Sequence, residues 1–152
     1  MPGYRGHLVG GTVVFFFALL GILLWCNPTA ITALEWLGFT LCGSLFPDID
    51  IKSKGQKLFY WLLAGLFVLL ISMNHLQMVA VLSVIALVPM LVRHRGLFHR
   101  PWFIILLPSA IAYILCAHVP SCKAIIVYDT FFFILGALSH LWLDMGRRMF
   151  RW

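Results

Sequence analysis

Seven of the histidine and aspartate residues stand in four short segments of this chain, separated by long apolar runs. Imidazole and carboxylate side chains together suit Zn²⁺, with Mn²⁺ or Fe as alternatives. The expected metal ligands are His7, Asp48, Asp50, His94, His99, His140 and Asp144. This set could hold two divalent ions, or one ion with the remaining carboxylates hydrogen-bonded around it.

The spacing within two of these segments favours metal binding. His140 and Asp144 are four residues apart, so they project from one face of a helix. Asp48 and Asp50 are two residues apart after a proline, and in an extended segment they would point the same way. An aspartate that does not bind the metal would be the general base, so both are candidate catalytic residues.

The third segment combines two histidines with an arginine. His94 and His99 are five residues apart, which in a regular helix would splay them, but Gly96 allows the segment to bend. Arg95 is a candidate catalytic residue, because its fork of donors would neutralise an anionic group such as a phosphoester.

The elements that carry these residues are expected to cross a membrane. The chain has 152 residues, of which 62% are hydrophobic and 11% charged, whereas soluble domains have about 25% charged residues. Backbone groups in lipid must pair within each segment, so we predict one all-α transmembrane bundle over residues 1–152. Its six predicted spans are 8–26, 31–46, 58–73, 76–92, 102–117 and 124–143.

The distribution of charge sets the orientation of this predicted bundle. With a cytoplasmic N-terminus, ten of the eleven Lys and Arg residues fall inside and only Lys123 falls outside. The positive-inside rule therefore predicts that both termini are cytoplasmic. The basic residues form short clusters between apolar runs rather than a long tract, which argues against nucleic-acid binding despite the net charge of +6.

This topology brings all seven ligand candidates to the cytoplasmic face. Each residue alone also has a structural interpretation. A histidine at the membrane interface can simply anchor its helix there, and a Pro-Asp-x-Asp loop can cap a helix. Arg95 can be one more of the positive charges on the cytoplasmic side. Their convergence favours function, because polar groups at membrane depth are costly and tend to be functional.

The order of these motifs resembles the YdjM-like family of predicted membrane-bound metal-dependent hydrolases, over nearly the whole chain. The motifs are His7, Pro47-Asp48-Ile49-Asp50, His94-Arg95-Gly96-x-x-His99 and His140-x-x-x-Asp144. Phe98 and Arg100 stand where small hydroxyl residues are common in that family. The resemblance implies a protein of the bacterial inner membrane.

We therefore expect a metal-dependent hydrolase that acts at the cytoplasmic interface on a lipid or another amphiphile. A phosphoester is the first expectation for the bond, with an amide or carboxylic ester as alternatives. A metal-ion or proton transporter is a second hypothesis, although the helix centres are almost entirely apolar and lack the mid-depth polar groups that transport needs. A membrane assembly protein with a structural metal is the third.

Overall fold

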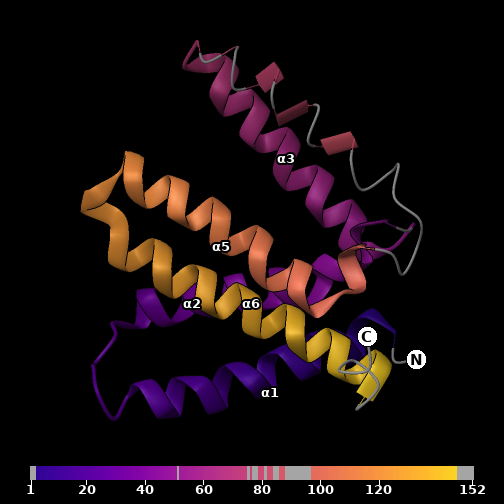
Figure 1. Ribbon diagram of the computed structural model, residues 1–152, viewed down its shortest axis with the longest axis vertical. Coiled ribbons are helices and arrows are strands. Elements are labelled where there is room, and N and C mark those ends of the chain that lie inside the picture. The colour runs from indigo at the N-terminus through magenta and orange to yellow at the C-terminus, as the bar shows by residue number, and fades with distance from the viewer. Residues whose placement is uncertain are drawn as a thin grey trace.

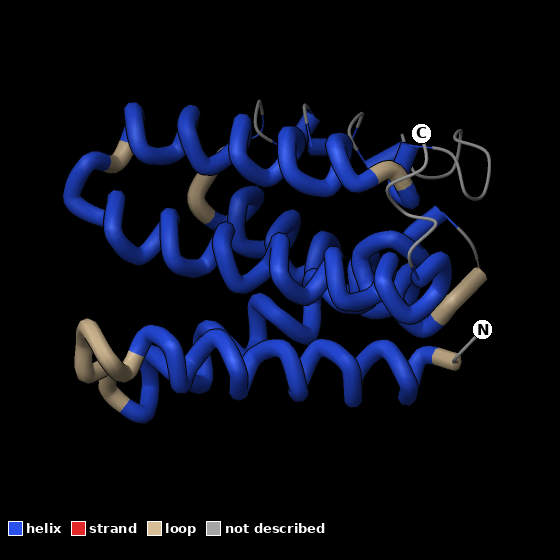
Figure 2. The backbone as a smooth tube through the Cα atoms, turned by 60° about the horizontal axis from the view of Figure 1, so that its bottom comes forward, coloured by secondary structure: helices blue, strands red, loops and turns tan. Residues whose placement is uncertain are grey.

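The computed structural model describes residues 3–50, 52–74, 76, 79–80, 82–83, 86–87 and 97–146. The side chain of Asp50 lies outside this description. Within these residues the chain consists of helices joined by loops, with no strand (Figures 1 and 2). The predicted all-α class is therefore confirmed.

Five long helices make up most of the described chain. They are α1 (Tyr4–Ile22), α2 (Ala30–Leu45), α3 (Lys54–Ser72), α5 (Pro101–His118) and α6 (Lys123–Met145), joined in part by the 3₁₀ turns η1 (Phe46–Asp50), η2 (Leu97–His99) and η3 (Pro120–Cys122). All five are long and apolar enough to cross a membrane. The fourth predicted span, 76–92, lies mostly outside the described residues, so five of the six predicted spans are seen.

Helices α1 and α3 begin about one turn earlier than the apolar runs that predicted them. At α3, the Ser53 side chain accepts a hydrogen bond from the Gln56 amide at 3.0 Å, which caps the helix N-terminus. Lys54 and Lys57 then fall inside the helix. A hydropathy pattern leaves charged residues out of a predicted span. The long stems of these lysines can nevertheless lie along apolar surface while the ammonium groups reach water.

Helix α6 is the centre of the bundle. It packs against α1, α2 and α5, which surround it in Figure 1. About 39% of its span is buried, against 11% for the α3 and α5 spans. In its middle, Phe132 is fully buried and stacks on Trp36 of α2, with ring centroids 4.9 Å apart.

Two glycines let α2 and α6 approach to backbone contact. A Cβ atom added at Gly136 of α6 would collide with the Thr40 carbonyl of α2. One added at Gly43 of α2 would collide with the Phe133 carbonyl of α6. Small residues at such crossings are the usual way for helices to pack closely in lipid. This close crossing fixes α6 against the C-terminal end of α2.

One end of the bundle collects most of the positive charge. Helices α1, α3 and α5 begin at this end, and α2 and α6 finish there (Figure 1). Of the described basic residues, Lys123 stands alone at the opposite end. The others follow the arrangement that the charge count predicted for the cytoplasmic side, and they are Arg5, Lys52, Lys54, Lys57 and Arg100.

Candidate metal centre

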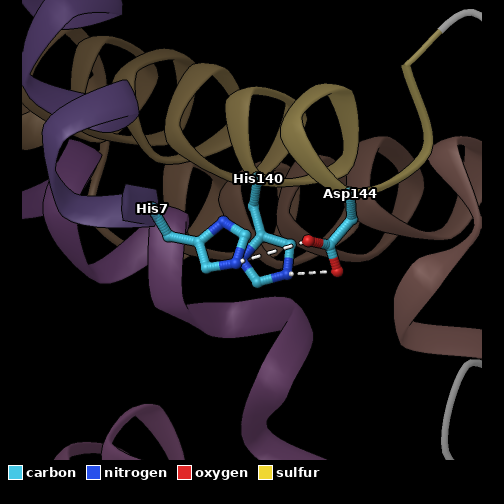
Figure 3. Close-up of side chains that lie close together, drawn as sticks. All are labelled: His7, His140 and Asp144. Carbon is cyan, nitrogen blue, oxygen red and sulfur yellow. Dashed lines mark ion pairs between the residues drawn. The ribbon is translucent and has the colours of Figure 1, made fainter. Parts of the chain in front are cut away.

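The last turns of α6 present His140 and Asp144 on one face, as their spacing predicts (Figure 3). His140 is fully buried, and the Asp144 side chain is 5% exposed. The Nε2 atom of His140 lies 3.7 Å from Oδ2 of Asp144. A histidine and a carboxylate are thus held together in the bundle interior at its basic end.

Helix α1 adds His7 to this pair. Its Nε2 atom lies 3.4 Å from Oδ1 of Asp144. Its ring stacks on His140 with centroids 3.7 Å apart, as Figure 3 shows. Gly11, one turn further along α1, makes the approach possible, since a Cβ atom there would lie 2.9 Å from the Ser44 Cβ.

The turn η1 supplies Asp48, although its backbone differs from the prediction. The segment is a 3₁₀ turn that continues α2, not an extended strand. The extended backbone assumed for this segment is therefore wrong, and the direction of the Asp50 side chain lies outside the described structure. Asp48 Oδ1 nevertheless lies 3.6 Å from His140 Nε2.

Two side chains of the following segment hold η1 in place. The Ser53 hydroxyl donates a hydrogen bond to the Asp48 carbonyl at 2.7 Å. The Gln56 amide nitrogen Nε2 donates one to the Ile49 carbonyl at 3.1 Å. The same Ser53 hydroxyl caps α3. The start of α3 therefore fixes the backbone that carries Asp48.

The turn η2 brings in His99 from the other side. Its Nε2 atom lies 3.9 Å from Oδ1 of Asp48, and its ring meets the His140 ring edge to face at 5.7 Å. His99 is 3% exposed. The predicted site residues His94 and Arg95, with the bend at Gly96, lie outside the described residues.

A backbone carbonyl selects the tautomer of the neutral His140 ring. Its Nδ1 atom is 2.7 Å from the Ser44 carbonyl oxygen, which can only accept, so Nδ1 carries the proton. In a 3₁₀ turn this carbonyl would pair with the amide of residue 47, but Pro47 has no N–H. The lone pair of His140 is therefore on Nε2, which is buried and makes no hydrogen bond to the described residues.

The distances in this cluster fit metal ligands better than direct ion pairs. Charge-assisted N–H···O hydrogen bonds are about 2.7–2.9 Å long, and the four N···O pairs here are 3.4–3.9 Å apart. Two ligand atoms bound about 2.1 Å from a tetrahedral ion lie about 3.4 Å apart. The described nitrogen and oxygen atoms are thus spaced much as ligands around a bound cation would be.

Two overlapping groups of ligands share His140. One contains His7, His140 and Asp144, and the other contains Asp48, His99 and His140. Within each group the ligand atoms lie within 4.8 Å of one another. Because Nδ1 of His140 is engaged with Ser44 and only Nε2 is available, this histidine can join one ion at a time.

Two residues that support the candidate ligands were not among those predicted from the sequence. Ser44 acts through its carbonyl group, which no side-chain pattern reveals, although Pro47 three residues later marks a carbonyl that lacks a 3₁₀ partner. Ser53 carried a clearer signal. A serine before a helix is a capping residue, and its place directly after the Asp48 turn would have linked the cap to the site.

Comparison with known proteins gives one family. The family model of the YdjM inner membrane protein matches residues 1–149. No curated protein and no solved structure matches the chain. The match spans all the described helices and all seven predicted ligands, so the resemblance drawn from the motifs is confirmed.

Proposed function

This chain belongs to the YdjM inner membrane protein family, and on that premise we propose that it is a membrane-embedded, metal-dependent hydrolase. Its site would act at the cytoplasmic interface on a lipid or another amphiphilic phosphoester. The observation that supports this most is the buried Nε2 atom of His140, which has a fixed lone pair and carboxylates 3.6 and 3.7 Å away. Zn²⁺ is the first choice for the ion on the chemistry of these ligands.

Within the cluster, the group of His7, His140 and Asp144 is the better shielded place for one ion. Its side chains are 0–5% exposed, whereas Asp48 in the other group is 18% exposed. A divalent cation bound there would supply Lewis acidity and would acidify water at neutral pH. Three protein ligands would leave a fourth position for substrate.

Asp48 is then suited to move the proton. Its side chain is 18% exposed, against 5% for Asp144, so water reaches it more readily. In the proposed reaction Asp48 takes a proton from water as the water oxygen bonds to phosphorus. The bond from phosphorus to the leaving oxygen breaks, and the proton passes to that oxygen. His99, 3.9 Å from Asp48, would orient the carboxylate.

The arrangement gives less support to transport. The next buried carboxylate along α6 is Asp129, eleven residues or about 16 Å from His140. The buried hydroxyls of Thr40, Ser44 and Ser139 each donate to a carbonyl of their own helix. Among the described residues, no titratable side chain of α6 connects Asp129 to the cluster, as a proton or ion path would require.

Metal content and turnover measured on one preparation test the proposal. We expect the purified protein to contain a divalent metal and to hydrolyse lipid phosphoesters in detergent. Metal without hydrolysis of any lipid phosphoester, ester or amide would instead support an assembly protein with a structural ion. Protein that binds no divalent metal would contradict both readings.

A further inference from the structure

An apolar cavity of about 530 Å³ lies between α2, α3, α5 and α6. This volume falls in the range of small-molecule sites, about 300–1,000 Å³. Along α5 its lining runs from Phe103 to Leu115, a rise of about 18 Å over twelve residues. The cavity is therefore elongated along the direction in which the chains of a lipid would lie.

One end of this cavity adjoins the candidate metal centre. Ile49 and Phe98 line it, and each is the direct neighbour of a cluster residue, Asp48 and His99. Both lining side chains are almost fully buried. Further along, Ile111 and Leu115 also line the cavity and are 50% and 45% exposed. The lining is thus buried beside the cluster and exposed on the lipid-facing surface toward the far end.

The described lining residues offer no free hydrogen-bonding side chain. Of these residues, only Thr130 carries a side-chain hydroxyl, and this group donates to the Ile126 carbonyl at 2.7 Å. Pro108, inside α5, also lines the cavity and lacks an N–H group. A polar or charged ligand would lose its hydration here without replacement, whereas a hydrocarbon chain would not.

We propose that this cavity holds an acyl chain of the substrate, so that the hydrolysed molecule is a long-chain lipid phosphoester rather than a water-soluble one. The inference rests on the proposed function and specifies its substrate class. The chain enters from the bilayer beside Ile111 and Leu115. The phosphoester then lies past Ile49 and Phe98, next to Asp48 and His99.

Photolabelling tests chain binding without relying on turnover. The probes are two dioleoyl-type phosphatidic acids, with a diazirine either near the carboxyl end or near the methyl end of one chain. We expect the first to label near Phe103 and the second near Ile111. Unlabelled dioleoyl phosphatidic acid should compete, and glycerol 3-phosphate should not.

A matched pair of variants on α5 separates the cavity from the lipid-facing surface. Ala112 is buried and lines the cavity, whereas Ala110 is exposed and does not. Ala112→Phe should lower labelling about tenfold or more, because each methylene kept out of an apolar site weakens binding. Ala110→Phe should leave labelling unchanged. If Ala112→Phe fails to fold by thermal melting, Ile111→Trp fills the same cavity from a more exposed position.

The results distinguish this inference from the hydrolase proposal. Ordered labelling that Ala112→Phe removes supports the acyl-chain cavity even if no lipid is hydrolysed, and the hydrolase proposal alone then fails. Labelling scattered over exposed residues such as Tyr113, and unaffected by Ala112→Phe, overturns the cavity assignment. Equal hydrolysis of dibutyryl and dioleoyl substrates by the parent and Ala112→Phe overturns it too, while the hydrolase proposal stands.

Discussion

At the scale of single residues, His140 links the two groups of ligands. Its Nδ1 proton is held by the Ser44 carbonyl, and its Nε2 atom faces both Asp48 and Asp144. Hydrogen bonding of the second ring nitrogen orients a metal-binding histidine and raises its basicity. His140 therefore depends on the end of α2 as much as on its own helix.

Replacing the ligands should separate metal loss from loss of stability. Asp144→Asn should empty the site with little change in melting temperature, because the amide keeps the shape of the carboxylate. His140→Ala should lose the metal and also destabilise the protein by about 1–3 kcal/mol, since it removes the buried hydrogen bond between the ring and the Ser44 carbonyl. Metal analysis and thermal melting in detergent measure both effects.

His118→Ala is the matched control for these two variants. His118 is exposed at the far end of α5, and Ile114, one turn earlier, accepts its hydrogen bond through the backbone carbonyl. Its replacement should change neither metal content nor activity. If Asp144→Asn keeps its full metal content, the assignment of Asp144 as a ligand is wrong.

Arg95→Lys tests the role predicted for this residue from the sequence. The substitution keeps the charge but removes the fork that can bind two oxygens of a phosphoester at once. We expect turnover to fall at least about tenfold with the metal content unchanged. If Arg95→Lys is as active as the parent protein, Arg95 contributes only a positive charge on the cytoplasmic side.

At the scale of elements, the cap of α3 is linked to the candidate metal centre by one hydroxyl group. The Ser53 hydroxyl both caps α3 and holds the Asp48 carbonyl. Ser53→Ala should cost about 1 kcal/mol of stability and should also weaken metal affinity, by about tenfold or more if it acts like other groups that orient metal ligands. Titration of the metal-free protein with Zn²⁺ measures this affinity.

Thr29→Ala controls for capping alone. Thr29 caps α2 at the opposite end of the bundle by accepting a hydrogen bond from the Thr32 amide at 3.2 Å. This variant should lose similar stability and keep its metal affinity. Equal loss of affinity in both variants would show that general loosening of the bundle, rather than the Asp48 turn, is responsible.

Replacing a glycine of α2 or α6 by alanine should destabilise the protein only where the two helices touch. Gly136→Ala places a methyl group against the Thr40 carbonyl, so the helices must separate and both melting temperature and metal content should fall. Gly38→Ala on α2 meets nothing within 4 Å and should be neutral, or stabilising by up to about 1 kcal/mol. A Gly136→Ala protein with parental stability and metal content would contradict the close packing.

Some of these elements could be foreseen from the sequence. The long apolar runs indicated helices, and the four-residue spacing of His140 and Asp144 placed them on one face, because neither inference requires tertiary information. The 3₁₀ turn around Asp48 was missed because Pro-Asp-x-Asp fits both a turn and an extended segment. The choice depends on contacts from residues further along the chain, such as the Ser53 bond.

At the scale of the whole molecule, the end of the bundle that carries most of the described basic residues also carries the candidate site. His7 of α1 and Asp144 of α6 lie 3.4 Å apart, so the start and finish of the described bundle meet at the basic end. Reporter fusions at Asn74 and Pro120 should therefore be extracytoplasmic, since these residues follow α3 and α5 at the opposite end. A cytoplasmic signal at either point would refute the predicted orientation.

At this scale it was predictable that the site residues would meet at one end of the bundle. Which side chains would face one another was not predictable. An up-and-down topology alone brings His7, Asp48, His99 and Asp144 to one end. Which nitrogen faces which carboxylate depends on how closely the helices cross. Gly11, Gly43 and Gly136 set those crossings through contacts with residues distant in the chain, and no local pattern records such contacts.

The position of His140 and Asp144 on α6 also has a consequence for biogenesis. The other described cluster residues enter the membrane earlier during synthesis, and none of the groups of three is complete without His140. Among the described residues, a nascent chain that lacks α6 therefore has neither group of three complete. If the proposed site binds metal, loading from the cytoplasm should follow insertion of α6, and a chain arrested before residue 123 should remain metal-free.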